Sequence, residues 1–307
     1  MTEPIQQDAI APELRGPLAK LPSLPLRSAL FRRLTTGLMK LRRPPSIPEV
    51  SITAHKAPAL RLYRPAVPRS DAALLWIHGG GYIIGTASID DALCASIARE
   101  LGIVVVSAEY RLAPRHPFPA PLDDCHAAWR WLRDEAAELG IDPARVAIGG
   151  MSAGGGLAAA LVQRVCDEAG PGPVAQLLMA PMLDDRTAAI RSLDALAHPV
   201  WDNALNRFGW EAYLSSRPGA ASLPPYASPA RREDLAGLPP AWIGVGAIEL
   251  FHDEDVAYAR RLEAAGVPVT LEVVPGAPHG FEAWGRETAI GRAHLAKATR
   301  WLSQALA

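Results

Sequence analysis

Residues 145–160, which read RVAIGGMSAGGGLAAA, decide the fold of this chain. The apolar run Arg145–Ile148 predicts a buried strand, and the Ala- and Leu-rich run from Ala153 predicts a helix. The turn Gly150-Met151-Ser152-Ala153-Gly154 joins them, and its glycines keep side chains from clashing. Such a turn raises the serine oxygen above the sheet, at a helix N-terminus whose dipole favours negative charge. Ser152 is therefore a candidate nucleophile; a glycine turn without chemistry is the alternative.

A second glycine motif, His78-Gly79-Gly80-Gly81, follows the apolar run Ala73–Ile77. Glycines let a backbone approach a ligand closely and adopt angles that other residues avoid. Serine attack on a carbonyl creates a negatively charged oxygen, which needs preorganised N–H donors. We expect those donors on Gly80, Gly81 and Ala153. His78 precedes the glycines inside the loop, so its expected role is structural, and a plain glycine turn is again the alternative.

Strands and helices alternate along most of the chain. This pattern predicts a mostly parallel sheet with helices on both faces. The expected strands are Val50–His55 and Leu60–Tyr63, as antiparallel edge strands, and then Ala73–Ile77, Ile103–Ser107, Arg145–Ile148, Val174–Met179, Ala241–Val245 and Val269–Val273. The expected helices are Asp91–Leu101, Leu122–Leu139, Ala153–Glu168, Asp253–Ala265 and Ala289–Leu306.

Two segments lie outside the alternation. Residues 1–24 are rich in Pro and polar residues and are expected to be loosely ordered, whereas Arg27–Arg43 has apolar residues at helical spacing: Leu30, Phe31, Leu34, Leu38 and Leu41. That helix is expected to pack on the protein, with a membrane-surface helix as the alternative. Residues 186–225 contain aromatic residues but no convincing strand, which predicts a helical insertion. The expected division is 1–45 cap segment, 46–185 and 226–307 core, and 186–225 cap insertion.

Composition limits the classes of function. Hydrophobic residues make up 49% of the 307 residues, enough for a buried core. The net charge of −1, without a long basic stripe, gives no support for nucleic-acid binding. Three widely spaced cysteines predict free thiols in a reducing compartment. The N-terminus lacks the features of a secretory signal, and no apolar run is long enough to span a bilayer, so we expect a cytoplasmic protein without stable membrane insertion. A homodimer is compatible with this sequence.

The serine needs a base, and His279 is the preferred one of eight histidines. It lies in the loop 275–281 after the strand Val269–Val273, at the strand end where such folds place active sites. Three acids follow core strands and could orient it: Glu249, Asp253 and Asp184. Asp253 is also a candidate helix cap. The chain order serine, acid, histidine fits all three, and Asp184 follows an earlier strand than the other two.

The chain resembles the hormone-sensitive-lipase family of esterases in four ordered motifs: HGGG at 78–81, EYRLAPRHPFPAPLDD at 109–124, GMSAGG at 150–155 and HGF at 279–281. The resemblance covers roughly residues 45–305. It implies an eight-stranded α/β-hydrolase core with a helical cap, and hydrolysis of esters with short to medium acyl chains. It also implies an oxyanion hole made by Gly80, Gly81 and Ala153, and no metal or organic cofactor. Residues of the second motif are expected to hold the oxyanion loop: Tyr110, Arg111, Asp123 and Asp124.

The same resemblance favours Glu249 as the triad acid, because the family usually has Asp at that position. Glutamate can do the work, since the need is a carboxylate that orients the histidine. Many relatives carry Asp where this chain has Met151, which offers a flexible apolar surface instead.

The expected substrate contacts come from the cap and from the motifs. Trp201, Leu205 and Phe208 are spaced by four and three residues, which places them on one helix face. That face either contacts substrate or packs on the core. The full expected set is Tyr82, Met151, Trp201, Leu205, Phe208 and Phe281. The rival functions are amidase, lactonase or acyltransferase on the same site, or a non-catalytic small-molecule receptor.

Overall fold

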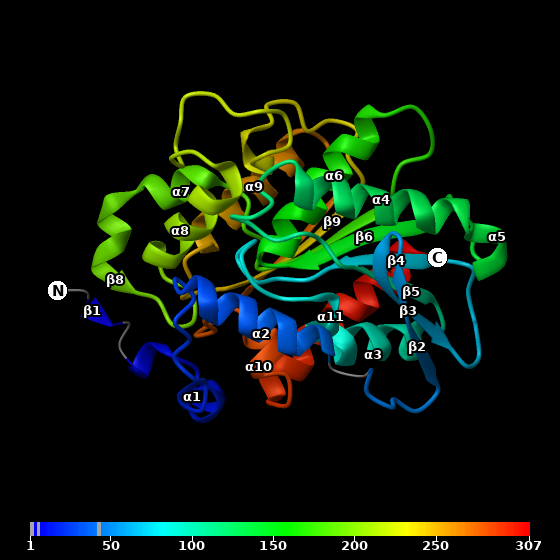
Figure 1. Cartoon of the computed structure of the whole chain (residues 1–307), viewed down its shortest axis with the longest axis horizontal. Coiled ribbons are helices and arrows are strands. Elements are labelled where there is room, and N and C mark those ends of the chain that lie inside the picture. The colour runs from blue at the N-terminus through cyan, green and yellow to red at the C-terminus, as the bar shows by residue number, and fades with distance from the viewer. Residues whose placement is uncertain (1–2, 5–6, 42–43) are drawn as a thin grey trace.

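A central eight-stranded sheet organises the protein (Figure 1). The computed structural model describes residues 3–4, 7–41 and 44–307. The strands lie in the order β10 (Val269–Val274), β9 (Ala241–Gly246), β7 (Ala175–Met179), β6 (Val146–Met151), β4 (Ala73–Ile77), β5 (Val104–Ala108), β3 (Ala59–Pro65) and β2 (Val50–Lys56). Only β3 among these strands runs against the others, because it pairs antiparallel with both β2 and β5. The predicted mostly parallel eight-stranded sheet is confirmed, although the second expected edge strand, β3, lies one place inside the edge.

Helices cover both faces of this sheet because its central strands are buried on both sides. In β4, Leu74 and Trp76 contact one apolar cluster and Leu75 and Ile77 contact the other, as the two-residue period of a strand requires. One face packs against α4 (Ala120–Asp134), α6 (Ala153–Asp167) and α9 (His252–Ala264). The other face packs against α3 (Asp91–Leu101) and α11 (Ala289–Ala305), and Figure 1 shows the two layers. The helix expected over Leu122–Leu139 is two helices, α4 and α5 (Ala136–Leu139).

The two segments outside the alternation lie together. The first contains β1 (Glu3–Pro4), η1 (Gln7–Ala9), α1 (Pro12–Ala19) and α2 (Ala29–Leu41). The second contains α7 (Asp185–Ala189), η3 (Arg191–Ala195), β8 (Leu196–Ala197) and α8 (Asn203–Leu214). β1 pairs in parallel with β8, and Arg27 Nη2 donates to the carbonyl of Ala204 at 3.2 Å. The shorter elements elsewhere are η2 (Ala87–Asp90), η4 (Pro229–Arg231) and α10 (Phe281–Trp284).

The expectation of loose order in residues 1–24 is wrong for α1. Pro12 begins this helix, where its missing N–H costs nothing, and Leu14 is fully buried. Leu14 belongs to an apolar cluster with Val274 and Phe281, which flank the loop of His279. Glu13 accepts hydrogen bonds from the first N–H groups of α11. The N-terminal segment is therefore attached to the C-terminal part of the core.

α2 packs on the protein as expected, but not through its leucines. Leu30, Leu34, Leu38 and Leu41 are 67%, 59%, 67% and 80% exposed, whereas Arg32 is only 7% exposed. Arg32 Nη1 donates to the carbonyl of Leu26 at 2.6 Å, and its guanidinium lies over the ring of Phe208. α2 therefore packs on the protein through a face centred on an arginine, and its apolar stripe faces solvent. Residues 42–43, where the predicted helix ends, lie outside the described residues.

Candidate active site

Ser152 occupies a strained turn between β6 and α6. Its φ of 56° lies in the left-handed region, which non-glycine residues rarely adopt. The flanking glycines are sterically required, since a Cβ on Gly150 would lie 2.3 Å from the carbonyl oxygen of Gly154, and one on Gly154 would lie 2.1 Å from that of Ile77. The backbone N–H of Ser152 donates to Met179 on the neighbouring strand β7 at 2.8 Å. The turn is thus fixed by its neighbours, and Ser152 lies directly before the first residue of α6.

Three side chains far apart in the sequence meet at this turn. His279 Nε2 lies 2.9 Å from Ser152 Oγ, and His279 Nδ1 lies 3.2 Å from Glu249 Oε2. Glu249 follows β9 and His279 follows β10, and these adjacent parallel strands end in register at Gly246 and Val274. All three side chains are buried, at 4–6% residue exposure. These two contacts link a hydroxyl, an imidazole and a carboxylate in one hydrogen-bonded chain.

The pKa of His279 is set by opposing influences. Burial lowers this pKa, but the charge of Glu249, the hydrogen bond from His279 to Glu249 and the charge of Glu282 outweigh it. The pKa of His279 is therefore raised above its ordinary value of 6.5. An imidazole held this way is a stronger base toward the serine proton than a free histidine.

The two other candidate acids contact other residues and not His279. The side chain of Asp253 is fully exposed, and it contacts the neighbouring His252. It is in the first turn of α9, but the helix shows no side-chain cap. Asp184 caps α7 through the N–H of Arg186 and forms an ion pair with the same arginine. Of the three, Glu249 is the one that reaches the imidazole.

The glycine loop after β4 adopts a conformation that requires glycine. Gly80 and Gly81 have φ values of 122° and 58°. A Cβ on Gly81 would lie 2.1 Å from the ring of Trp201, and one on Gly80 would lie 2.0 Å from the carbonyl oxygen of Ile84. Among the described residues, the N–H groups of Gly80 and Gly81 donate to no carbonyl. They are therefore available as donors beside Ser152 and Ala153.

The segment 109–124 contacts this loop through Tyr110. Tyr110 Oη donates to the carbonyl of His78 at 2.9 Å, and the two rings stack with centroids 4.2 Å apart. Arg111 forms a bidentate ion pair with Asp124, at 2.8 Å for the shortest contacts. Asp123 pairs with Arg164 on α6. Of the four residues expected to hold the loop, Tyr110 contacts it directly, whereas Arg111 and Asp124 pair with each other and Asp123 pairs with α6.

Ser152 and His279 open into a cavity of about 560 Å³. Of the expected substrate contacts, Met151, Trp201 and Leu205 line it, together with Gly80 and Gly81. Other apolar residues of the lining were not among the expected contacts: Leu18, Leu21, Leu24, Leu26 and Val200 from the two cap segments, and Ala283 and Trp284 from α10. Leucines alternate with proline and serine before α2, and this apolar content was the signal that could have identified the segment as part of the cavity.

The other three expected contacts do not line that cavity. Tyr82 is buried and stacks on Tyr213 with centroids 4.0 Å apart. Phe208 carries the guanidinium of Arg32 on its ring at 5.0 Å. Phe281 is buried against His294. Each ring packs within the scaffold, because the helix face that carries Phe208 meets α2 and the HGF motif turns its phenylalanine into the core.

Two buried carboxyl groups near Glu249 were not anticipated. Glu282 and Asp255 are 4% and 0% exposed, and none of their carboxylate oxygens has a hydrogen-bond partner among the described residues. Burial raises the pKa of both groups, and the charge of Glu249 raises them further, although His294 and His279 oppose this at Glu282. Both lie in the first turn of a helix and belong to no recognisable motif, so the sequence offered no signal for their burial.

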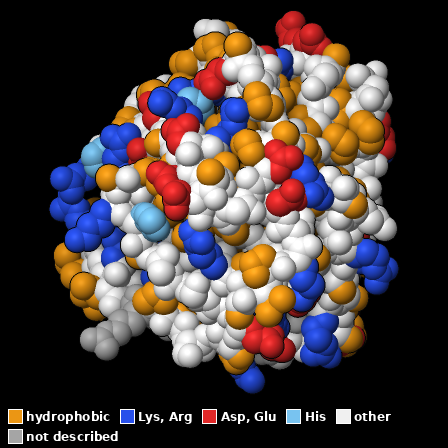
Figure 2. All heavy atoms as spheres, turned by 90° about the vertical axis from the view of Figure 1, so that its right-hand side faces the viewer, with side chains coloured by type: hydrophobic (Ala, Val, Ile, Leu, Met, Phe, Trp, Pro, Cys, Tyr) orange, Lys and Arg blue, Asp and Glu red, His pale blue; other side chains and the backbone are white. Residues whose placement is uncertain are grey.

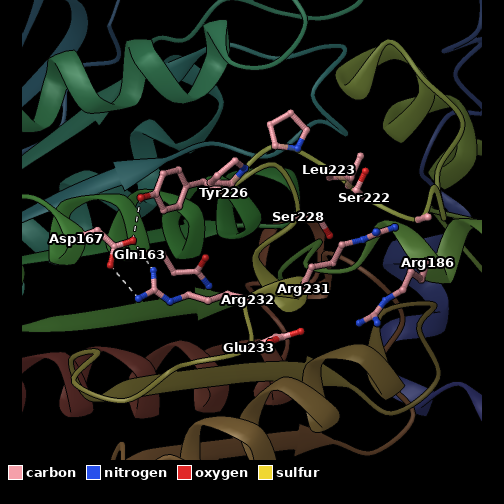
Figure 3. A pocket seen from close by; sticks show the side chains of 13 residues that line it. Gln163, Asp167, Arg186, Ser222, Leu223, Tyr226, Ser228, Arg231, Arg232 and Glu233 are labelled. Carbon is pink, nitrogen blue, oxygen red and sulfur yellow. Dashed lines mark hydrogen bonds and ion pairs between the residues drawn. The ribbon is translucent and has the colours of Figure 1, made fainter.

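A second cavity, of about 630 Å³, lies between α6 and the segment 221–233 (Figure 3). Its arginines are already neutralised. Figure 3 shows Asp167 between Tyr226 and Arg232, and the ion pair with Arg232 is 2.6 Å long. Arg231 pairs with the buried Asp185 at 2.6 Å. These pairs attach the loop to the core.

Within the described part of the chain, no group of three His, Cys, Asp or Glu side chains is arranged to hold a metal ion.

Comparison with known proteins agrees with this geometry. A family model described as alpha/beta hydrolase fold matches residues 74–283. Ethyl acetate hydrolase of Pseudomonas putida is 35% identical over 269 residues, which cover 80% of this chain and 79% of that protein. Carboxylesterase NlhH of Mycobacterium tuberculosis is 35% identical, with 92% of each chain covered. The structure of a bacterial heroin esterase superimposes with a TM-score of 0.88 at 36% identity, covering 98% of this chain and 99% of that one. The chain therefore belongs to the alpha/beta hydrolase family and, within it, to the serine esterases that resemble hormone-sensitive lipase.

Proposed function

We propose that the protein hydrolyses carboxylic esters through an acyl-enzyme intermediate on Ser152, with His279 as base and Glu249 as the acid of the triad. The observation that carries this proposal is the pair of contacts at the imidazole, 2.9 Å to Ser152 Oγ and 3.2 Å to Glu249 Oε2. A hydroxyl becomes an effective nucleophile when a positioned base takes its proton, and the base works best when a third group orients it.

In the first half of the reaction, Ser152 Oγ attacks the ester carbonyl as His279 Nε2 takes the hydroxyl proton. The carbonyl oxygen gains the negative charge, and the N–H groups of Gly80, Gly81 and Ala153 donate hydrogen bonds to it. The C–O bond of the ester then breaks, and His279 gives the proton to the leaving alcohol. Glu249 stabilises the imidazolium that exists between these two steps.

In the second half, water attacks the acyl group on Ser152. His279 takes a proton from the water and returns it to Ser152 Oγ when the acid product leaves. The enzyme thus returns to its starting state, and the net change is one ester and one water converted to one acid and one alcohol.

The cavity supports short to medium acyl chains as the substrate class. Its volume of about 560 Å³ and its leucine and tryptophan lining suit an apolar chain of limited length. The relative named ethyl acetate hydrolase points in the same direction. Turnover of p-nitrophenyl esters of increasing acyl length tests this, and we expect an optimum below long-chain esters.

Residues 1–45 and 186–225 form the cap in this proposal, above core parts 46–185 and 226–307. Support comes from the side chains that both segments contribute to the cavity, among them Leu21, Leu24 and Trp201. Deletion of residues 1–30 should change the acyl-length profile or the melting temperature before it changes the triad chemistry. An unchanged profile together with an unchanged melting temperature contradicts this role.

Amide, lactone and acyl-transfer reactions use the same chemical steps and are the nearest rivals. A panel of esters, lactones and amides with matched acyl groups separates them, and a receptor on this fold would turn over none of these substrates. The buried contact between Ser152 and His279 favours an enzyme over a receptor.

The expected cytoplasmic location, the homodimer and the absence of cofactors and nucleic-acid partners stay predictions. Among the described residues, no helix has the length and apolar character that a membrane crossing demands.

A further inference from the structure

The exposed face of α2 concentrates the apolar surface of the molecule. Of the twelve most exposed large apolar side chains in the described part of the chain, six lie between Leu21 and Leu41. Four of these form a stripe on α2, which we call the leucine stripe: Leu30, Leu34, Leu38 and Leu41. Their spacings of four, four and three residues keep them on one side of the helix.

A basic cavity borders the adjacent side of the same helix. Ala29, Arg33, Thr36 and Lys40 lie one residue before or two residues after members of the leucine stripe, and they line a cavity of about 620 Å³. The segment 110–116 forms the opposite wall. The described residues that line this cavity include five cationic side chains and no carboxylate: Arg32, Arg33, Lys40, Arg111 and Arg115.

The positive charge of this cavity is only partly neutralised from outside. Lys40 pairs with Glu109 at 3.1 Å, and Arg111 pairs with Asp124. Arg32, Arg33 and Arg115 have no carboxylate partner among the described residues. Burial and the charge of Arg33 lower the pKa of Arg32, which reflects the cost of holding two cations together without an anion.

One polar atom in the cavity wall also lacks a partner. Thr36 Oγ1 is buried and makes no hydrogen bond within the described structure. A phosphate oxygen accepts hydrogen bonds from hydroxyl and guanidinium groups alike, and arginine binds it in a bidentate manner. The wall therefore has the chemistry of a phosphate-binding surface.

Figure 2 shows the neighbourhood of this region from one end of the molecule. Lys and Arg side chains gather along the left margin of that face, with hydrophobic side chains directly below them. The left margin corresponds to the front of Figure 1, where α2 lies. Basic and apolar groups therefore share one margin of the protein.

We propose that α2 and its basic cavity bind the surface of an anionic phospholipid membrane. The leucine stripe enters the interfacial layer, while Arg33 and Arg115, exposed and unpaired among the described residues, contact lipid phosphates. Amphipathic helices lie on membranes in this way. Leu21 and Leu24 are exposed and line the active-site cavity as well, so the same N-terminal segment connects this surface to the entrance. The proposal goes beyond ester hydrolysis: it states where the enzyme meets apolar substrates.

A second copy of the chain suits this surface less well. Across a two-fold axis a surface meets itself, so the unpaired arginines beside one stripe would approach those of the other copy. The stripe is also small. A thirteen-residue helix about 20 Å long and about 10 Å wide offers about 200 Å², against roughly 800 Å² per partner in a stable dimer.

The test is co-sedimentation of the full chain with phospholipid vesicles. One set contains phosphatidylcholine alone, and in the other a third of the lipid is phosphatidylglycerol. We expect binding to the anionic set, and we expect it to weaken as salt is added. Equal binding to both sets, or binding to neither, overturns the proposal.

Matched variants separate the two parts of the surface. Leu38→Ser removes a side chain that is 67% exposed, and Val67→Ser removes one that is 68% exposed outside the proposed surface. We expect about fivefold weaker binding or more for the first, from the apolar area withdrawn from lipid, and no change for the second. The double variant Arg33→Ala/Arg115→Ala should bind about 25-fold more weakly, at about fivefold for each basic residue near the surface. The control Arg217→Ala/Arg300→Ala changes the net charge equally at exposed positions elsewhere.

Two further readouts make the outcomes distinct. Turnover of the soluble ester p-nitrophenyl acetate should be unchanged in all these variants, which monitors the triad independently of membrane binding. Sedimentation velocity should show the same species for the wild type and Leu38→Ser. A wild-type dimer that Leu38→Ser abolishes would overturn the proposal and identify the leucine stripe as an interface between copies.

Discussion

Replacing Glu249 by Gln removes a negative charge from the imidazole while it keeps the size of the side chain. Glu249 Oε2 lies 3.2 Å from His279 Nδ1, and the carboxylate side chain is fully buried. At a charge separation of about 4 Å and an effective dielectric constant of about 20, an imidazolium and a carboxylate attract each other by about 4 kcal/mol. The imidazolium forms as the reaction proceeds, so this attraction lowers the barrier. We therefore expect Glu249→Gln to reduce kcat about a thousandfold, at about 1.4 kcal/mol per factor of ten.

The assay is kcat for p-nitrophenyl butyrate hydrolysis, with the melting temperature as the control for folding. Asp253→Asn is the matched comparison, because it makes the same chemical change on a fully exposed side chain that contacts only its neighbour His252 in the described structure. We expect it to change kcat by about twofold at most. The reasoning is refuted if Glu249→Gln stays within a factor of ten of the wild type, or if Asp253→Asn is the slow variant.

Four more outcomes follow from the structure. Ser152→Ala should reduce kcat by at least about 10⁴-fold without lowering the melting temperature, and a folded variant with wild-type turnover would exclude Ser152 as the nucleophile. Because the base must be neutral and the pKa of His279 is raised above 6.5, kcat/KM should fall as the pH falls through a midpoint above 6.5. A wild-type kcat/KM unchanged down to about pH 4.5 would argue against a histidine base. Glu282→Gln removes one of the charges that raise the pKa of His279, so the midpoint of the variant should move to lower pH. Leu14→Ala should cost about 2–5 kcal/mol of unfolding free energy because Leu14 is fully buried, and Leu24→Ala, at an exposed position, should cost much less; equal melting temperatures would show that α1 does not stabilise the fold.

Local sequence was sufficient for the parts of the site that lie within one turn or loop. The strand, glycine turn and helix around Ser152 follow from apolar period and glycine spacing, and the structure has them at β6 and α6. The glycine loop after Ala73–Ile77 is equally local, since its positive φ angles need residues without a Cβ. Such features depend on neighbours in the chain, so the chain itself reveals them.

The choice among the acids needed the three-dimensional arrangement. Glu249 and Asp253 are four residues apart, and either one fits the chain order. Only the adjacent ends of β9 and β10 bring Glu249 to the imidazole, 30 residues away in sequence. Family resemblance favoured this residue, but no local pattern distinguishes a carboxylate that faces a histidine from one that faces water.

The cap shows most clearly what the sequence by itself determined and what only the tertiary structure decided. The apolar period of residues 29–41 was enough to predict a helix, because backbone hydrogen bonding and side-chain spacing are local properties. The side of that helix that faces the protein was decided by the surface it meets. The guanidinium of Arg32 lies over the ring of Phe208, so the face with Arg32 is buried and the leucines stay in solvent. In the same way, Leu14 is buried only because Val274 and Phe281, more than 250 residues along the chain, provide the apolar surface that covers it. A pattern of polar and apolar residues states that a helix has two faces, and the surfaces that distant segments offer decide which one is buried.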